Sequence, residues 1–193
     1  GSIEINGVDI RKYDLESLRA QIGYVAQKAH MFKGSIKSNI CFGKPEASDE
    51  EMHHAASVAQ ASDFISKREN GYLDEIAEDG TNISGGQKQR LSIARVILKK
   101  PSLYIYDDSF SALDFKTDAT LRKALKPEVK DAIFFVVAQR ISTIMDSDMI
   151  IVLDEGQIIG LGTHLELLKN CSVYQEIAHS QLTQKELDDY ERN

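Results

Sequence analysis

The run Ser84-Gly85-Gly86-Gln87 combines residue types that can bind an anion, and it stands directly before a helical pattern. The two glycines allow the backbone to approach an anion closely, and the start of the following helix offers free N–H groups at the positive end of the helix dipole. Ser84 and Gln87 add side-chain donors. Four residues by themselves are still explained better by an ordinary loop and helix cap, so their chemistry depends on the surrounding sequence.

A second chemical group is the carboxylate pair Asp107 and Asp108, which ends an apolar run that begins at Leu103. A carboxylate at the end of a buried strand needs a cation or hydrogen-bond donors, because burial without a partner is costly. Gln27 also ends an apolar run, and Asp114 follows the carboxylate pair closely. Taken singly, Gln27 is equally well a strand-end glutamine and Asp114 a helix N-cap.

The elements that must position these groups alternate between strand and helix. Apolar residues recur at helical spacing from Gln87 up to Pro101, which predicts a helix between them. Alternating strands and helices indicate an α/β fold whose core strands are parallel. Buried strands are predicted over 22–26, 103–107 and 132–138, and hairpins are predicted at Asn6-Gly7 and Glu155-Gly156.

Composition excludes several classes of protein. The 193 residues are enough for one domain with a small subdomain, and 42% hydrophobic with 27% charged residues is ordinary for a globular protein. The formal net charge of −7 argues against a nucleic-acid partner. No apolar run approaches the roughly 18 residues that cross a bilayer, and no signal peptide is visible. Cys41 and Cys171 lack metal-type spacing and suit a reducing compartment.

The motifs together resemble a known family. The pattern that starts at Ser84 continues through Gln87-Lys88-Gln89-Arg90-Leu91-Ser92-Ile93-Ala94-Arg95, and Pro101, Asp107-Asp108 and Ser111-Ala112-Leu113-Asp114 follow in order. Over nearly its whole length the chain resembles the nucleotide-binding domain of ABC transporters, most closely the exporter type. The resemblance implies a partial P-loop NTPase (RecA-like) α/β core with a helical subdomain over about 34 to 95. The highly charged residues 184–193 are expected to be a solvated tail.

The resemblance implies ATP and Mg²⁺ as cofactors and gives roles to the groups above. Asp107 matches the Walker B aspartate that holds Mg²⁺, and Gln27 matches the Q-loop glutamine that approaches Mg²⁺ and the attacking water. Asp114 matches the D-loop aspartate at a dimer interface. The signature residues, which bind the γ-phosphate of ATP held mainly by the opposite subunit, are matched by Ser84, Gly85, Gly86 and Gln87.

Two residues depart from the family pattern at the catalytic centre. Asp108 stands where the family usually has a glutamate that polarises water, and its carboxylate is retracted by roughly 1.5 Å. Misplacement on that scale can cost about 10²-fold in rate. Gln139 stands where the family has a switch histidine, and Gln carries no positive charge. The two changes favour the degenerate half of a heterodimeric exporter; the alternative is tolerated variation in an active enzyme.

One family motif is absent: the phosphate loop GxxxxGK[ST] occurs nowhere in the sequence. The resemblance places it upstream of Gly1, so the chain is expected to begin after that loop and to lack its strand and helix. The parent protein is expected to be an ATP hydrolase, whereas this fragment alone is expected to be inactive and not to bind ATP with useful affinity. Loss of a strand also exposes sheet edges, which favours self-association.

The implied function is that of an ATP-binding subunit, which couples ATP binding and hydrolysis at a head-to-tail dimer interface to export across a membrane. The implied partners are a second, non-identical nucleotide-binding domain and a transmembrane domain, which Glu78-Asp79-Gly80 is expected to contact. The implied location is the cytoplasmic face of the cell membrane, with tethering through a transmembrane domain absent from this chain. Two alternatives stay open: a soluble ABC-type ATPase acting on DNA or ribosomes, and a non-hydrolysing nucleotide sensor.

Overall fold

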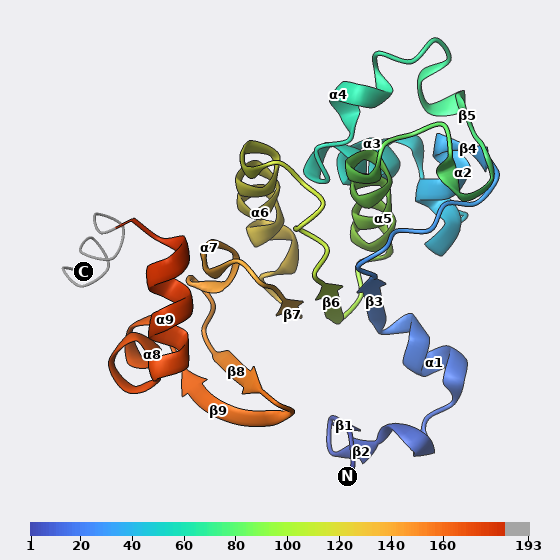
Figure 1. The fold of residues 1–193 in the computed structure, drawn as a ribbon. Helices are drawn as coiled ribbons and strands as arrows, with labels where there is room; N and C mark the ends of the chain where they lie inside the picture. Colours follow the sequence, from blue (N-terminus) through green and yellow to red (C-terminus); the bar gives the residue numbers. More distant parts are fainter. Residues whose placement is uncertain (184–193) are drawn as a thin grey trace. The chain divides into compact units, whose positions relative to one another are not determined.

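The computed structural model describes residues 1–183, which form two compact units, Gly1–Val137 and the described residues from Ala138 onward (Figure 1). The predicted charged tail, residues 184–193, lies outside the described residues. The strands of the first unit are β1 (Glu4–Ile5), β2 (Val8–Asp9), β3 (Ile22–Val25), β4 (Gly34–Ser35), β5 (Glu75–Ile76), β6 (Leu103–Asp107) and β7 (Ile133–Val137). Its α-helices are α1 (Leu15–Ala20), α2 (Ile36–Ile40), α3 (Asp49–Val58), α4 (Ser62–Ile65), α5 (Gly85–Lys99) and α6 (Phe115–Val129). Short 3-10 turns are η1 (Ile10–Lys12), η2 (Cys41–Gly43), η3 (Gly71–Leu73) and η4 (Glu78–Gly80).

The central sheet of the first unit has the order β3-β6-β7, and both of its strand pairs are parallel. The register aligns Val25 with Tyr106 and Asp107 with Val137. Strands that run in the same direction bring their carboxyl ends to one edge of the sheet, which is where ligands bind in open α/β sheets. The parallel α/β core predicted from the sequence is confirmed.

Helix α5 is the main buried helix of the first unit, and it packs against α2, α3 and β3 (Figure 1). Leu91 and Ile93 are fully buried, as the apolar pattern predicts. The helix ends at Lys99 because Lys100 adopts a left-handed conformation with φ 51° and Pro101 follows. A rigid, buried α5 fixes the direction in which its exposed N-terminus points.

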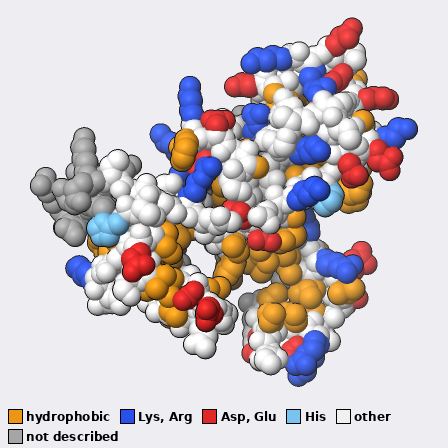
Figure 2. All heavy atoms as spheres, in the orientation of Figure 1, with side chains coloured by type: hydrophobic (Ala, Val, Ile, Leu, Met, Phe, Trp, Pro, Cys, Tyr) orange, Lys and Arg blue, Asp and Glu red, His pale blue; other side chains and the backbone are white. Residues whose placement is uncertain are grey.

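Strand β7 corrects the prediction of a strand buried on both faces. Phe134 and Val136 pack against the core, whereas Ile133, Phe135 and Val137 are 67%, 50% and 46% exposed. Successive side chains of a strand point to opposite faces, and within the described part of the first unit nothing covers the second face. Figure 2 shows hydrophobic side chains, in orange, exposed on the surface of the molecule.

The predicted helical subdomain over about 34 to 95 contains α2, α3, α4, most of α5 and the antiparallel pair of β4 and β5. Ser48 and Glu51 form a reciprocal capping box at the start of α3, so the helix begins where its sequence predicts. The boundaries of the subdomain stay a prediction.

The elements of the second unit are α7 (Ile141–Ile144), β8 (Ile150–Asp154), β9 (Gln157–Gly162), α8 (His164–Asn170) and α9 (Ser172–Gln181). The unit has its own core, in which Ile141, Val152 and Tyr174 are buried. Its β8–β9 hairpin turns at Glu155 and Gly156, whose φ angles are 44° and 78°, as the sequence predicts.

Among residues 1–183, no helix is both long enough and apolar enough to cross a membrane.

Candidate functional site

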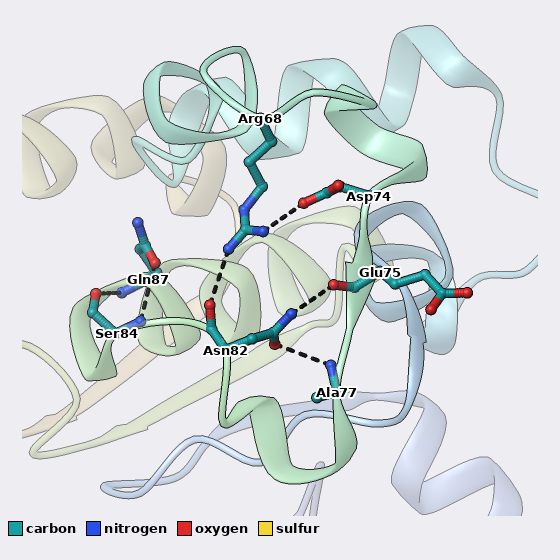
Figure 3. Close-up of polar contacts among 7 residues, drawn as sticks. All are labelled: Arg68, Asp74, Glu75, Ala77, Asn82, Ser84 and Gln87. Carbon is teal, nitrogen blue, oxygen red and sulfur yellow. Dashed lines mark hydrogen bonds and ion pairs between the residues drawn. The ribbon is translucent and has the colours of Figure 1, made fainter.

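The Ser84–Gln87 turn is an exposed capping box at the N-terminus of α5. The Gln87 backbone N–H donates to Ser84 Oγ at 3.3 Å, and the Ser84 N–H donates to Gln87 Oε1 at 3.0 Å (Figure 3). A Cβ added to Gly85 would meet nothing within 4 Å. The turn is therefore a helix cap, as the simplest interpretation of the four residues held, and it also leaves open space over helix-start N–H groups that have no intrahelical partner.

Gly86 brings this turn against the segment that leads to Asp114. A Cβ at Gly86 would lie 3.2 Å from the Ala112 carbonyl oxygen, a tight contact that glycine avoids. Arg90 reinforces the same region, since its side chain donates to the Gly86 carbonyl at 3.3 Å and to the Gln60 carbonyl at 2.7 Å. Burial lowers the pKa of Arg90, and the charge of Asp114 opposes that shift.

Asp114 is the N-cap of α6. Its carboxylate accepts from the Thr117 backbone N–H at 2.9 Å and from the Thr117 hydroxyl at 2.7 Å. These two bonds, the hydroxyl bond first, hold the pKa of Asp114 below its usual range. The N-cap interpretation of Asp114 is confirmed, and its side chain is exposed.

Asp107 is held from the neighbouring strand. The Tyr24 hydroxyl, on β3, donates to Asp107 Oδ2 at 2.8 Å. This hydrogen bond raises the pKa of Tyr24, because ionised Tyr24 would lose the donor and face a carboxylate. Sequence reasoning missed Tyr24. Tyr24 could have been noticed because it lies three residues before Gln27, on the strand that pairs in parallel with β6.

Asp108 contacts Gln27, another residue named from the sequence. Gln27 Nε2 donates to Asp108 Oδ2 at 3.1 Å. The Asp108 backbone is left-handed with φ 44°, its N–H donates to the Val137 carbonyl at 2.9 Å, and its own carbonyl accepts from the Ser111 hydroxyl at 2.7 Å. Aspartate tolerates this conformation better than most residues, so the short side chain at this corner also has a backbone explanation.

Gln89 connects α5 to the residue before Gln27. Its side chain is 1% exposed, and its Nε2 donates to the Ala26 carbonyl at 3.1 Å. The helix that begins at the Ser84–Gln87 turn therefore also fixes the backbone beside the Gln27–Asp108 pair. Sequence reasoning missed Gln89 as well, although a glutamine four residues before Ile93, on the apolar face of the helix, was a usable signal.

Gln139 lies in the second unit, just before α7. Its side chain is exposed, and its backbone carbonyl accepts from Gln181 Nε2 at 2.8 Å. Gln181 Oε1 also accepts from the Ile141 N–H at 2.9 Å, so one side chain of α9 holds both ends of the turn that carries Gln139.

The carboxylate oxygens at this site suit a cation whose other ligands are waters and substrate phosphates. Among residues 1–183, no group of three or more His, Cys, Asp or Glu side chains is placed to hold a metal ion. Asp107 Oδ2 is engaged by Tyr24, whereas Oδ1 accepts no hydrogen bond from the described residues. A single carboxylate oxygen fits Mg²⁺, which commonly binds one or two carboxylates, several waters and substrate phosphates.

Comparison with known proteins gives consistent results. A family model described as ABC transporter matches residues 1–111. The chain is 41% identical over 184 residues to an uncharacterized ABC transporter ATP-binding protein of Mycobacterium tuberculosis, covering 94% of this chain and 31% of the relative. It is 45% identical over 177 residues to a Bacillus subtilis protein named as a candidate multidrug export ATP-binding/permease protein, covering 92% of this chain and 30% of the relative.

A solved structure agrees with these sequence matches. The fold superposes on a bacterial Atm1-family ABC exporter with ATP bound, with a TM-score of 0.91, 38% identity, and coverage of 95% of this chain and 32% of the other. The chain thus spans about a third of the length of the proteins that it matches. The P-loop NTPase fold predicted from the sequence is confirmed.

Proposed function

Because this chain belongs to the ABC transporter family, we propose that it is part of the ATP-binding portion of an exporter. In that role it couples ATP binding and hydrolysis, at a head-to-tail interface between two nucleotide-binding domains, to transport across a membrane. The observation that carries the proposal is the exposed Ser84–Gln87 turn, whose open side at Gly85 leaves room for a phosphate chain presented by another subunit.

In this proposal the chain supplies groups to two nucleotide sites. The Ser84–Gln87 turn offers backbone N–H groups and the Ser84 hydroxyl to the γ-phosphate of the ATP bound by the partner, and Asp114 lies at the interface between the two domains. Asp107 holds Mg²⁺ for the chain's own site, and Gln27 lies beside that ion and the attacking water. Bound Mg²⁺ would neutralise charge on the transferred phosphoryl group.

The two sites are proposed to be unequal. Asp108 is proposed to belong to the chain's own site, where its retracted carboxylate supports water activation poorly. Gln139 stands at the family's switch position, where its neutral amide supports charge stabilisation poorly. The signature turn has all four residues of the family pattern, so the site that it completes for the partner is the active one. The partner is therefore proposed to be a non-identical nucleotide-binding domain.

The test compares Ser84→Ala with Asp108→Ala in the full-length protein assembled with its partner. Ser84→Ala should lower ATP turnover by about 10²-fold, the typical effect of removing a donor to the reacting phosphoryl or acyl group. Asp108→Ala should lower it far less, and exposed Ser66→Ala serves as the control. If Asp108→Ala abolishes turnover as completely as Ser84→Ala does, the asymmetric assignment is wrong. If the unmodified assembly binds ATP without any turnover, the non-hydrolysing sensor replaces it.

The 193-residue chain by itself is proposed to be inactive. No GxxxxGK[ST] run is present to wrap the phosphates, and a single signature turn offers only helix-start N–H groups. Titration of the purified chain with MgATP should give no binding in the micromolar range. Micromolar affinity would contradict this part of the proposal and would require a second phosphate-binding element within these residues.

A further inference from the structure

Asn82, two residues before Ser84, folds the preceding segment back onto β5. Its Nδ2 donates to the Glu75 carbonyl at 2.8 Å, and its Oδ1 accepts from the Ala77 backbone N–H at 3.0 Å (Figure 3). The side-chain amide of Asn82 therefore joins the end of the loop over 77–82 to the start of the loop at Ala77 and to β5 at Glu75. Both donor and acceptor of the amide are used, so no other side chain of similar size reproduces the pair of bonds.

Arg68 also holds Asn82 in place, through a bond to the Asn82 backbone. Its guanidinium forms an ion pair with Asp74 and also donates to the Asn82 backbone carbonyl at 3.2 Å (Figure 3). The Arg68 and Asp74 side chains are only 21% and 20% exposed, so the pair is partly shielded from water. The planar fork of arginine lets one side chain join Asp74 and Asn82 at once, which a lysine cannot do in this geometry.

The loop between these anchors is itself compact. Asp79 and Gly80 both have positive φ angles, 54° and 64°, and Lys88 Nζ on α5 donates to the Asp79 carbonyl at 2.7 Å. A Cβ at Gly80 would lie 3.1 Å from Met31 and Lys88 side-chain atoms. The segment is therefore tied to β5 by Asn82 and to α5 by Lys88.

The Ser84–Gln87 turn depends on this segment for its placement. A Cβ added to Gly85 would have no neighbour within 4 Å, and the side-chain bonds of Ser84 and Gln87 are internal to the turn. Packing of α5 fixes the turn from its C-terminal side. On its N-terminal side the nearest anchors are the buried Ile83 side chain and the amide of Asn82.

We propose that Asn82, held by Arg68, is a positioning residue that sets the Ser84–Gln87 turn for the nucleotide bound by the partner domain. This inference rests on the proposed function, because it concerns the same turn. Asn82 contacts no nucleotide in this proposal; it keeps the turn in the orientation that the closed pair of domains requires, so that closure does not have to order the loop first.

The test is a kinetic comparison in the full-length protein assembled with its partner. Asn82→Ala removes two hydrogen bonds, which should weaken ATP-driven closure about tenfold. If closure is strongly favoured in the unmodified protein, the KM for ATP rises about tenfold while kcat changes less than about twofold. A variant that merely unfolds part of the protein population lowers kcat and leaves KM unchanged, so the two effects separate.

Graded variants and a matched control sharpen the result. Asn82→Asp keeps the acceptor for the Ala77 N–H but sets a carboxylate oxygen against the Glu75 carbonyl oxygen, so its KM should rise at least as much as that of Asn82→Ala. Arg68→Lys keeps a cation beside Asp74 but not the bridge to Asn82, and a rise of about threefold in KM is expected. Asn70→Ala is the control, because Asn70 is exposed and its side chain bonds to none of the described residues; its KM should not change.

The outcomes distinguish this inference from the proposed function. If Ser84→Ala stops turnover while Asn82→Ala leaves KM within twofold of the unmodified value, the positioning role is wrong and the proposed function stands. If Ser84→Ala has no effect, the proposed function itself fails. Should Asn82→Ala not fold, unchanged KM values in both Asn82→Asp and Arg68→Lys would equally overturn the positioning role.

Discussion

The Ser84–Gln87 turn and the Asp107–Asp108 corner hold their polar groups by opposite means. The turn is closed by bonds between residues three apart in sequence, whereas Tyr24 and Gln27 reach Asp107 and Asp108 from 83 and 81 residues away. A turn stabilised by its own residues keeps its shape when its surroundings change. The corner has its shape only while β3 and β6 remain paired.

Gln89 links the Ser84–Gln87 turn to the Asp107–Asp108 corner. It lies on the helix that starts at the turn, and it bonds to the Ala26 carbonyl beside the corner. Any shift of α5 against β3 therefore moves the Gln27 backbone, while the capping box at the start of α5 is untouched.

Gln89→Leu should loosen the corner and spare the turn. The substitution leaves the Ala26 carbonyl without its buried donor, a loss of about 1–3 kcal/mol. In the full-length protein, amide hydrogen exchange should accelerate about tenfold or more in peptides that cover residues 24–30. The exchange rate at Gln87, whose N–H is bonded within the capping box, should not change. Exposed Gln157→Leu is the control, and equal acceleration in both regions would show that the two are not held independently.

Gly86→Ala and Gly85→Ala should have opposite effects on the start of α5. A methyl group at position 86 meets the Ala112 backbone carbonyl at 3.2 Å, and such overpacking typically costs about 1–3 kcal/mol. At position 85 the methyl group meets nothing within 4 Å, so the higher helix propensity of alanine should stabilise the first turn by roughly 0.5–1 kcal/mol. Hydrogen exchange over residues 85–92 in the full-length protein measures both. Destabilisation by Gly85→Ala would mean that the turn is less open than its neighbours indicate.

Asp107→Asn should lower the pKa of Tyr24 toward its ordinary value. The bond to Asp107 raises the pKa of Tyr24 in the folded protein, so its contribution to stability is complete below the unfolded value near 10 and is lost as pH rises through the folded value. Spectrophotometric titration from pH 8 to 12, compared with Tyr24→Phe to assign the signal, measures the shift. The effect should be small because Tyr24 is 53% exposed. An unchanged pKa would show that the corner is not held by this bond in solution.

Much of the fold followed from local sequence signals. The Asn6-Gly7 and Glu155-Gly156 hairpins and the stop at Pro101 occur where the pattern predicts them, and reciprocal capping boxes begin α3 at Ser48 and α8 at Thr163. Each depends on dihedral preferences or hydrogen bonds between residues a few positions apart. The start of α5 belongs to the same group, since Ser84 and Gln87 make up a capping box by themselves.

The errors and omissions arose where distant segments meet. Helix α6 continues to Val129 through Pro127, although proline removes a helical hydrogen bond and commonly ends a helix. An apolar run such as 132–138 predicts a strand, but whether both faces are covered depends on which elements pack there, and Phe135 is half exposed. Tyr24 and Gln89 carried no motif, because a single tyrosine or glutamine gains a role only from the group that the fold places opposite it.

By itself the sequence determined the α/β class, the Ser84–Gln87 helix cap and the identity of the polar residues at the strand ends. It could do so because caps, turns and amphipathic periods are set by neighbours in the chain. The folded structure was needed to show that Tyr24 bonds Asp107, that Gln27 bonds Asp108, that Gln89 reaches the Ala26 carbonyl and that a Cβ at Gly86 would lie 3.2 Å from the Ala112 carbonyl oxygen. Those contacts depend on the parallel register of β3 against β6 and on the burial of α5, which no local pattern specifies.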